Sequence, residues 1–475
     1  MRRTALILFL VSFAARLATL PFMEIPYDEA AYAWTAQNLA THGGWLNLYG
    51  SDDLFFFPPL FNYLAALVIK LGVDRLYAVR LVTILFSSAI PPLICLLSVR
   101  SGLSARAGII AAALWLILPW GWHLSVAGMV ETPWIACLLA ALFCAQRGRQ
   151  VGQVRDAVLA AILFLAALWI KETVLGTVPL FLWAFWKQKR LLAWWSIVAF
   201  AGFAPLAAQS FLPHEYDLFY EITTPIILWN NFSFDPLIAN WGIMHGTALA
   251  PWQGWGQAFT VFTLIVLVLS IAAVPRAAWR EHFILPAAAG FLLIYVPFFM
   301  LFPKKFPYYL LPVYLFALFF VGRYLAERLR FAVLYGAILL LFAVPAIARL
   351  ADRSDEEDYR TAFSMVLREN PAGRIGLTLP RKAEYVAERA GVPIALDPTD
   401  WLHCRGKATE CLYRNDYIMS DSMFLLMLFC RQWPMSPETC DMNAYTAAKE
   451  RLVPLFKGRD FTLYRVNRPE APTTP

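Results

Sequence analysis

Long, uninterrupted apolar runs dominate the first 350 residues of the chain. Seven runs reach the roughly 17 to 25 residues that a helix needs to cross a hydrocarbon core about 30 Å thick. They cover residues 4–22, 77–99, 107–124, 191–212, 257–275, 283–302 and 331–350. Four shorter runs cover residues 132–146, 156–170, 173–186 and 308–322. The pattern predicts a polytopic α-helical membrane protein with about eleven transmembrane helices.

One further apolar segment, 58–72, is treated differently, because counting it as a span would reverse the side of every later loop. We expect it to be an external helix at the membrane interface. Two external loops are then long, 22–76 and 213–256. Residues 1–22 also fit a cleaved signal peptide, but the length of the run and Pro21, a helix terminator, favour a span.

Charged residues sort by side of the membrane. With eleven spans, 15 Lys and Arg residues fall in loops on one side and five on the other. By the positive-inside rule the basic side, with the N-terminus, is cytoplasmic, and the C-terminal residues are periplasmic. The external loops before residue 351 hold 12 acidic residues and the internal loops three. The net charge of +7 is therefore mainly a topology signal, and it does not indicate nucleic-acid binding.

The composition changes after residue 350. The last 125 residues carry 35 charged residues, 17 basic and 18 acidic, against 38 in the 350 residues before them. Short apolar runs at 374–379, 392–396, 416–419 and 461–466 alternate with helix-like stretches at 359–369, 382–390 and 443–452. This alternation predicts a small soluble α/β domain over residues 351–475, after a membrane domain over 1–350.

Four of the seven cysteines lie in this C-terminal domain: Cys404, Cys411, Cys430 and Cys440. An even number on the external side favours two disulfides, most simply between neighbours in sequence, although three pairings are possible. A zinc site is the alternative, but paired C-x-x-C spacing is lacking.

Acidic residues lie at two places on the predicted outer face. Asp28 and Glu29 follow the first span, and Glu131 opens a later one. Carboxylates at the membrane surface are costly unless they are solvated or used in chemistry. Asp28 and Glu29 also suit the N-terminus of a helix, whose dipole favours negative charge.

Lysines appear against the positive-inside trend at Lys171 and at the pair Lys304-Lys305. Such cations need an anionic partner, and a phosphate at headgroup level is the natural one; snorkelling from a helix end is the alternative. A base, a second acid and a cation site on one outer face suit sugar transfer from a lipid-linked phosphate. A transporter or lipid flippase is the rival, but the spans hold few ionisable residues and no inverted repeat is evident.

A set of short motifs in fixed order extends from residue 1 to about 320. They are Tyr27-Asp28-Glu29-Ala30-Ala31-Tyr32, Pro58-Pro59-Leu60 with Tyr63, Arg80, Glu131, Lys171 and Lys305-Phe306-Pro307-Tyr308-Tyr309-Leu310-Leu311-Pro312. In this set the chain resembles the GT-C glycosyltransferases of the protein O-mannosyltransferase and aminoarabinose (lipid A) transferase type.

The resemblance implies the GT-C fold, a polyprenyl-phosphate-linked sugar donor and an inverting displacement onto a glycan, lipid or protein acceptor outside the inner membrane. Asp28 would be the catalytic base, supported by Glu29, with Glu131 as the second acid. The residues near the donor phosphate or sugar would be Lys304, Lys305, Tyr308, Arg16 and Lys171. Further pocket residues would be Tyr32, Pro58, Pro59, Tyr63 and Arg80.

The chain departs from the family pattern at two places. Phe55-Phe56-Phe57 precede Pro58, where members that act on lipid A often carry a Glu-Lys pair. The second acid is Glu131 where an Asp is usual, and Glu172 follows Lys171. Members differ in metal use, so a divalent ion bound by Asp28 or Glu131 is left open.

Overall fold

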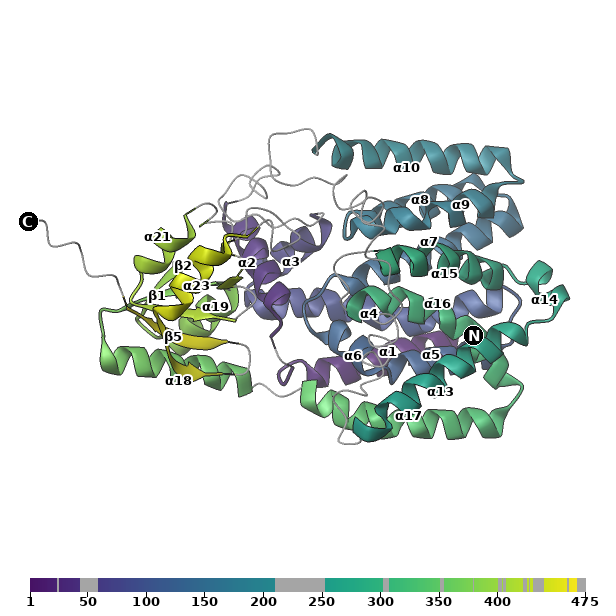
Figure 1. Ribbon diagram of the computed structural model, residues 1–475. Coiled ribbons are helices and arrows are strands. Elements are labelled where there is room, and N and C mark those ends of the chain that lie inside the picture. Colours follow the sequence, from purple (N-terminus) through teal and green to yellow (C-terminus); the bar gives the residue numbers. More distant parts are fainter. Residues whose placement is uncertain are drawn as a thin grey trace, which may run out of the picture. The chain divides into compact units, whose positions relative to one another are not determined.

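The chain forms two compact units whose positions relative to each other are not determined (Figure 1). The first comprises Met1–Met23, Thr35–Leu48 and Phe55–Ala351, and the second Glu24–Trp34, Tyr49–Leu54 and Asp352–Pro475. The computed structural model describes residues 1–23, 25–42, 59–209, 253–301, 307–350, 354–378, 380–399, 404, 407–421, 425–426, 428–429, 440–458 and 461–467.

The first unit is helical throughout its described residues. Each apolar run predicted to span the membrane contains a helix or a pair of helices, and α3 occupies the segment expected to lie at the interface. The helices are α1 (Arg2–Thr19), α3 (Leu60–Lys70), α4 (Arg75–Arg100), α5 (Ala105–Leu116), α6 (Pro119–Val126), α7 (Glu131–Val151), α8 (Val154–Leu168), η1 (Glu172–Thr177), α9 (Val178–Phe185), α10 (Lys189–Gln209), α13 (Gln253–Ala272), α14 (Arg276–Glu281), α15 (Ile284–Leu301), η3 (Pro307–Leu310), α16 (Leu311–Ala326) and α17 (Leu329–Leu350). Helix α2 (Tyr27–His42) begins in the second unit and ends in the first.

Some of these helices are candidate membrane spans by their length and composition. Among the described residues, α4 and Leu329–Ala348 of α17 are each long and apolar enough to cross a bilayer, and α5 with α6 makes a third if the pair is one span. Shorter apolar helices are Leu60–Lys70, Glu172–Phe185, Thr260–Ala272, Ile284–Pro297 and Leu311–Ala326. The number of eleven spans remains a prediction.

The run 107–124, expected to be one straight span, is broken. Helix α5 ends at Leu116, and α6 starts at Pro119 at an angle of 71°. Proline lacks the N–H that would continue α5, and it keeps the residue before it out of the helical region, as the extended Leu118 shows. Pro119 instead takes the first position of a new helix, where no donor is needed.

Helix α4 lies at the centre of the first unit, in contact with α1, α3, α5, α6 and α7 (Figure 1). A second close contact joins α5 and α16 at Gly322. A Cβ atom at this glycine would lie only 2.6 Å from the carbonyl oxygen of Ala107. The absence of a side chain therefore allows the two backbones to approach, as small residues do between membrane helices.

The second unit contains a five-stranded sheet in the order β2-β1-β3-β5-β4. Strand β1 pairs in parallel with β2 and β3, whereas β5 pairs antiparallel with β3 and β4. The strands are β1 (Arg374–Leu377), β2 (Ala395–Pro398), β3 (Tyr417–Ser420), β4 (Leu452–Lys457) and β5 (Thr462–Val466), and the helices are α18 (Ser354–Glu369), α19 (Pro380–Ala390), α21 (Ala408–Tyr413) and α23 (Met442–Glu450). The small α/β sheet agrees with the sequence pattern, except that β4 and α21 were not predicted.

Alternating side chains of β3 reach two separate cores. Tyr417 and Met419 join α18 and α19 on one face, while Ile418 joins α21 and α23 on the other. This is the two-residue period expected of a strand covered on both faces.

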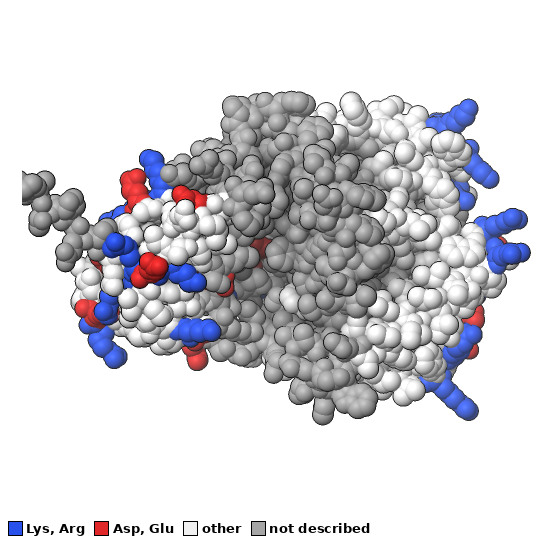
Figure 2. Space-filling view, in the orientation of Figure 1, with Lys and Arg blue, Asp and Glu red and all other residues white. Residues whose placement is uncertain are grey.

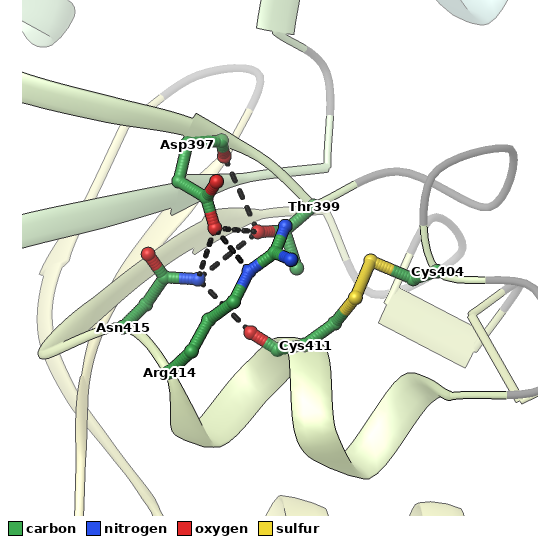
Figure 3. Close-up of a disulfide and its surroundings, with 6 residues drawn as sticks. All are labelled: Asp397, Thr399, Cys404, Cys411, Arg414 and Asn415. Atoms are coloured by element: carbon green, nitrogen blue, oxygen red, sulfur yellow. Dashed lines mark hydrogen bonds and ion pairs between the residues drawn. A yellow bond between two sulfur atoms is a disulfide. The ribbon is translucent and has the colours of Figure 1, made fainter. Parts of the chain in front are cut away.

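A polar network and a disulfide lie on the α21 side of this sheet (Figure 3). Cys404 and Cys411 are joined by a disulfide. The Asn415 amide, four residues on, donates to Asp397 Oδ2 at 3.0 Å, Thr399 Oγ1 at 3.1 Å and the Cys411 carbonyl at 3.0 Å. Arg414 Nε donates to the same carboxylate oxygen at 2.5 Å. Cys440 is also disulfide-bonded, and Cys430 lies outside the described residues.

The network crosses β1 at Gly376. A Cβ atom there would lie 2.5 Å from Ile418 Cδ1 and 2.7 Å from both Asn415 Nδ2 and Thr399 Oγ1. We therefore predict that Gly376→Ala lowers the free energy of unfolding of the second unit by about 1–3 kcal/mol through overpacking. Limited proteolysis of the full-length protein over a temperature series measures this.

The control for this substitution is Gly336→Ala in α17, where a Cβ atom would meet nothing within 4 Å. It should leave the cleavage of residues 354–467 unchanged. Equal behaviour of the two variants would contradict the role given to Gly376.

Candidate active site

Two opposite charges are buried together in the first unit. Lys171 Nζ lies 3.5 Å from Glu131 Oε1, and the two side chains are only 4% and 5% exposed. The other carboxylate oxygen, Glu131 Oε2, is buried and has no hydrogen-bond partner among the described residues. Because buried charges are costly to leave uncompensated, each residue of this pair stabilises the charge of the other.

Two tyrosines accompany the pair. Lys171 Nζ lies 5.4 Å from the ring centre of Tyr309 in η3, a cation–π distance. Tyr295 of α15 is 3% exposed and interacts electrostatically with Tyr309, Lys171 and Glu131. The start of α7, the turn after α8, α15 and η3 therefore converge on one polar cluster.

The turn that carries Glu131 is fixed by buried side-chain hydrogen bonds. Thr83 Oγ1 of α4 donates to the Met129 carbonyl at 3.1 Å, and Thr132 Oγ1 donates to the Leu124 carbonyl at 3.1 Å. One turn along α4, Ser87 Oγ donates to the Ser125 carbonyl at 3.0 Å. These bonds satisfy carbonyls that the break between α6 and α7 leaves without helical partners.

Arg16 of α1 is fully buried and binds the same region. Its guanidinium donates to the Ser12 carbonyl at 3.2 Å and to Ser125 Oγ at 3.4 Å, and it lies 5.2 Å from the ring centre of Trp122. It also bonds Ser12 Oγ. These contacts connect α1 to α6.

The turn that carries Lys171 is connected to α3 and α10. The Leu60 amide at the start of α3 donates to the Trp169 carbonyl at 2.9 Å, and Trp169 Nε1 donates to the Gly202 carbonyl at 2.9 Å. Pro59, buried beside Leu60, caps α3, so the second proline of the Pro-Pro motif lies close to the Lys171 turn. Tyr63 follows one turn later, and burial raises the pKa of its phenol.

Arg80 of α4 is fully buried and caps α1. Its guanidinium donates to the Leu20 carbonyl at 2.8 Å and to the Met23 carbonyl at 3.2 Å, beyond the last turn of that helix. A cation at a helix C-terminus binds free carbonyls and complements the dipole. Arg80 thus holds the chain just before the Asp28-Glu29 segment.

Asp28, Glu29 and Tyr32 lie in the first two turns of α2. Glu29 and Tyr32 are buried and Asp28 is half-buried. They belong to the second unit and Glu131 and Lys171 to the first, so the predicted acids fall in two units whose relative positions are not determined.

Of the remaining predicted residues, one lies in a described element and three do not. Tyr308 lies in η3, next to Tyr309. Three lie outside the described residues: Pro58, Lys304 and Lys305. Among the described residues no group of three or more His, Cys, Asp or Glu side chains could hold a metal ion.

Sequence reasoning missed Tyr295 and the hydroxyls of Thr83, Ser87, Ser125 and Thr132. Each is a polar group inside or next to an apolar run, and this position is the signal that could have found it. A single hydroxyl is too common in membrane helices for that signal to be decisive.

The turn before Glu131 provides a direct test of this positioning. Thr83→Val keeps the side-chain volume but leaves the Met129 carbonyl without this donor, at a cost of about 1–3 kcal/mol. We predict about tenfold faster amide hydrogen exchange in residues 119–131. Hydrogen-exchange mass spectrometry of the full chain measures this.

The matched control is Thr19→Val, because the Thr19 hydroxyl bonds only carbonyls of its own helix α1 among its described contacts. It should leave residues 119–131 unchanged. Unaltered exchange in Thr83→Val would exclude the proposed support.

Comparisons with known proteins bear on the whole chain. Residues 57–214 match the family described as dolichyl-phosphate-mannose-protein mannosyltransferase. The crystal structure of ArnT from Cupriavidus metallidurans bound to undecaprenyl phosphate is similar, with 15% identity, 97% of each chain covered and a TM-score of 0.57. The apo structure of the same protein gives 14% identity, the same coverage and a TM-score of 0.54. No curated protein sequence matches significantly.

ArnT is a GT-C glycosyltransferase, and its likeness extends over almost the whole chain. The resemblance inferred from the ordered motifs is thereby confirmed: this chain has the fold of the GT-C glycosyltransferase superfamily.

Proposed function

We propose that this protein is an inner-membrane glycosyltransferase that moves a sugar from a polyprenyl-phosphate carrier to an acceptor outside the cytoplasm. The observation that carries the proposal is the likeness, over 97% of both chains, to an ArnT structure bound to undecaprenyl phosphate. The match to a mannosyltransferase family over residues 57–214 supports the same class of donor.

The proposed reaction is a single displacement with inversion. An acceptor hydroxyl or amine attacks the anomeric carbon, the bond from that carbon to the phosphate oxygen breaks, and the polyprenyl phosphate leaves with the electron pair. Asp28 takes the proton of the acceptor, and Glu29 supports it. The carboxylate accepts the proton that the acceptor loses in the transition state. Nearby cations stabilise the negative charge that develops on the leaving phosphate, and both effects lower the barrier.

Glu131 and Lys171 act together in this scheme. Lys171 is held by Glu131 Oε1, and Glu131 Oε2 is left free of described partners to accept a hydrogen bond from substrate. Lys304, Lys305 and Tyr308 complete the proposed phosphate site. We assign Arg16 to holding α6, because its guanidinium is fully buried and bonded to Ser12 and Ser125.

The disulfides of the second unit indicate an oxidising compartment. It contains the Cys404–Cys411 disulfide, and Cys440 is disulfide-bonded as well. Disulfides persist in the periplasm and are rare in the cytosol. This supports a periplasmic location for the second unit. It also supports an acceptor that is a glycan, lipid or protein of the cell envelope.

The test measures bond cleavage, which a flippase would not perform. Purified protein is incubated with undecaprenyl phosphate linked to aminoarabinose, glucose or mannose, together with envelope extract as acceptor, and released undecaprenyl phosphate is quantified. We predict release from at least one donor, and a loss of about 100-fold or more in Asp28→Asn, the size expected for a general base.

Binding of undecaprenyl phosphate to Asp28→Asn, measured by native mass spectrometry, is the control and should equal that of the unaltered protein. Undiminished release by Asp28→Asn would refute the base assignment. Translocation of an intact donor without release would replace the proposed function with that of a flippase.

A further inference from the structure

Basic residues of the first unit gather at one end of a broad surface that carries no charged side chains (Figure 2). Several have acidic partners there. Arg147 and Arg155 lie 3.4 and 3.9 Å from Asp156. Arg323 and Arg328 lie 3.2 and 3.6 Å from Glu327. These cations are already compensated by the protein itself.

The turn between α9 and α10 differs from these places. Lys187, Lys189 and Arg190 are exposed there, and Arg149 lies close by at the end of α7. In the described part of the chain, none of the four forms an ion pair. Four cations therefore lie around one turn without a described counter-charge.

Arg149 is held in place by aromatic and backbone contacts. Its guanidinium lies 5.0 Å from the ring centre of Trp183 and 5.6 Å from that of Phe283. Gln188 Nε2, in the turn, donates to the Arg149 carbonyl at 2.8 Å. These contacts connect the end of α7 to the α9–α10 turn.

The outer face of α10 changes its chemistry with depth. Arg190, Trp194 and Ile197 are four and three residues apart and share one helix face. Trp194 is 45% exposed and Ile197 60%, and Phe200 in the next turn is 73% exposed. At 1.5 Å per residue, Arg190 lies about 6 Å beyond Trp194 along the axis. Along this face an apolar segment is followed by an indole and then by a guanidinium. The same order of side chains is found on membrane helices from the hydrocarbon core to the headgroup region.

Helix α9 repeats this order towards the same turn. Leu182 and Trp183 are each 39% exposed, Trp186 is 72% exposed, and Lys187 follows directly. Exposed indoles beside cations are typical of the membrane interface, where the ring lies at headgroup level.

We propose that the α9–α10 turn is a binding site for an anionic phospholipid of the phosphatidylglycerol type. The phosphate contacts Lys187, Lys189 and Arg190 together with Arg149, and the acyl chains run along Ile197 and Phe200. Charge complementarity carries the proposal, since none of these four cations forms an ion pair in the described part of the chain and the nearby Asp156 is already paired with Arg147 and Arg155. The flanking face of exposed apolar side chains fits lipid. The site does not depend on the proposed sugar transfer.

The test uses full-length protein in mixed micelles with equal amounts of phosphatidylglycerol and phosphatidylcholine, and native mass spectrometry to count retained lipids. We predict that phosphatidylglycerol is retained preferentially. The triple variant Lys187→Gln, Lys189→Gln, Arg190→Gln should reduce its retention by about tenfold or more, because each cation near the surface attracts anionic lipid.

The matched control is Arg323→Gln, Arg328→Gln, Arg330→Gln, which removes three cations from the α16–α17 turn, where Glu327 already compensates two of them. It should retain phosphatidylglycerol within about twofold of the unaltered protein. Unfolding temperatures in phosphatidylcholine alone should be equal for all three proteins, which establishes that the variants fold.

Two results would overturn the proposal. One is equal retention of the two lipids by the unaltered protein. The other is an equal loss in both triple variants, which would show a response to net charge alone. Displacement of the lipid by glycerol phosphate, which lacks acyl chains, would equally refute a lipid site in favour of a phosphate site.

Discussion

The ion pair between Glu131 and Lys171 is the interaction on which the arrangement of the first unit depends. Both side chains are almost fully buried, so neither charge has water to compensate it. Removing one partner from a buried pair is far more costly than removing both, because the remaining charge stays unpaired. The start of α7 and the turn after α8 therefore meet where these two charges compensate each other.

Each residue of the pair is supported by a separate part of the helix bundle. The Glu131 turn is connected to α4 through Thr83, and to α1 and α4 through Ser125 of α6. The Lys171 turn is connected to α3 and α10 through Trp169. These hydrogen bonds satisfy polar groups that would be costly alone within a membrane protein, and they support the turns that carry the two charged side chains. In the proposed reaction, such support would keep the charges in place to stabilise a leaving phosphate.

Much of the fold could be predicted from the sequence, since apolar runs of span length and strands of period two are local patterns. The exceptions have physical reasons. Pro119 divides a continuous apolar run into α5 and α6. The run is hydrophobic enough for one span, but proline has no N–H with which to continue the hydrogen bonding of α5. Strand β4 was not predicted because Pro454 lies within it. Among the described strands β4 pairs with β5 alone, at the edge of the sheet, where a proline is tolerated.

The site was only partly predictable. Lysines on the predicted outer face stand out against the positive-inside trend, and acids at the membrane surface are costly, so Glu131 and Lys171 could be selected from sequence. The function of Arg80 could not, because the carbonyls that it caps lie about sixty residues earlier in the chain. The roles of Thr83 and Ser87 could not be predicted either, because their hydroxyls reach the carbonyls that they bind only when α4 packs against the turn before α7.

The central claim is that Glu131 and Lys171 stabilise the protein as a pair. A double-mutant cycle with Glu131→Gln and Lys171→Met tests it, using unfolding free energies of the full-length protein in mixed micelles. We predict that each single change costs about 3–5 kcal/mol, and that the double change costs at least about 2 kcal/mol less than the sum of the two. Additive losses would show that the two residues act independently and would contradict the account.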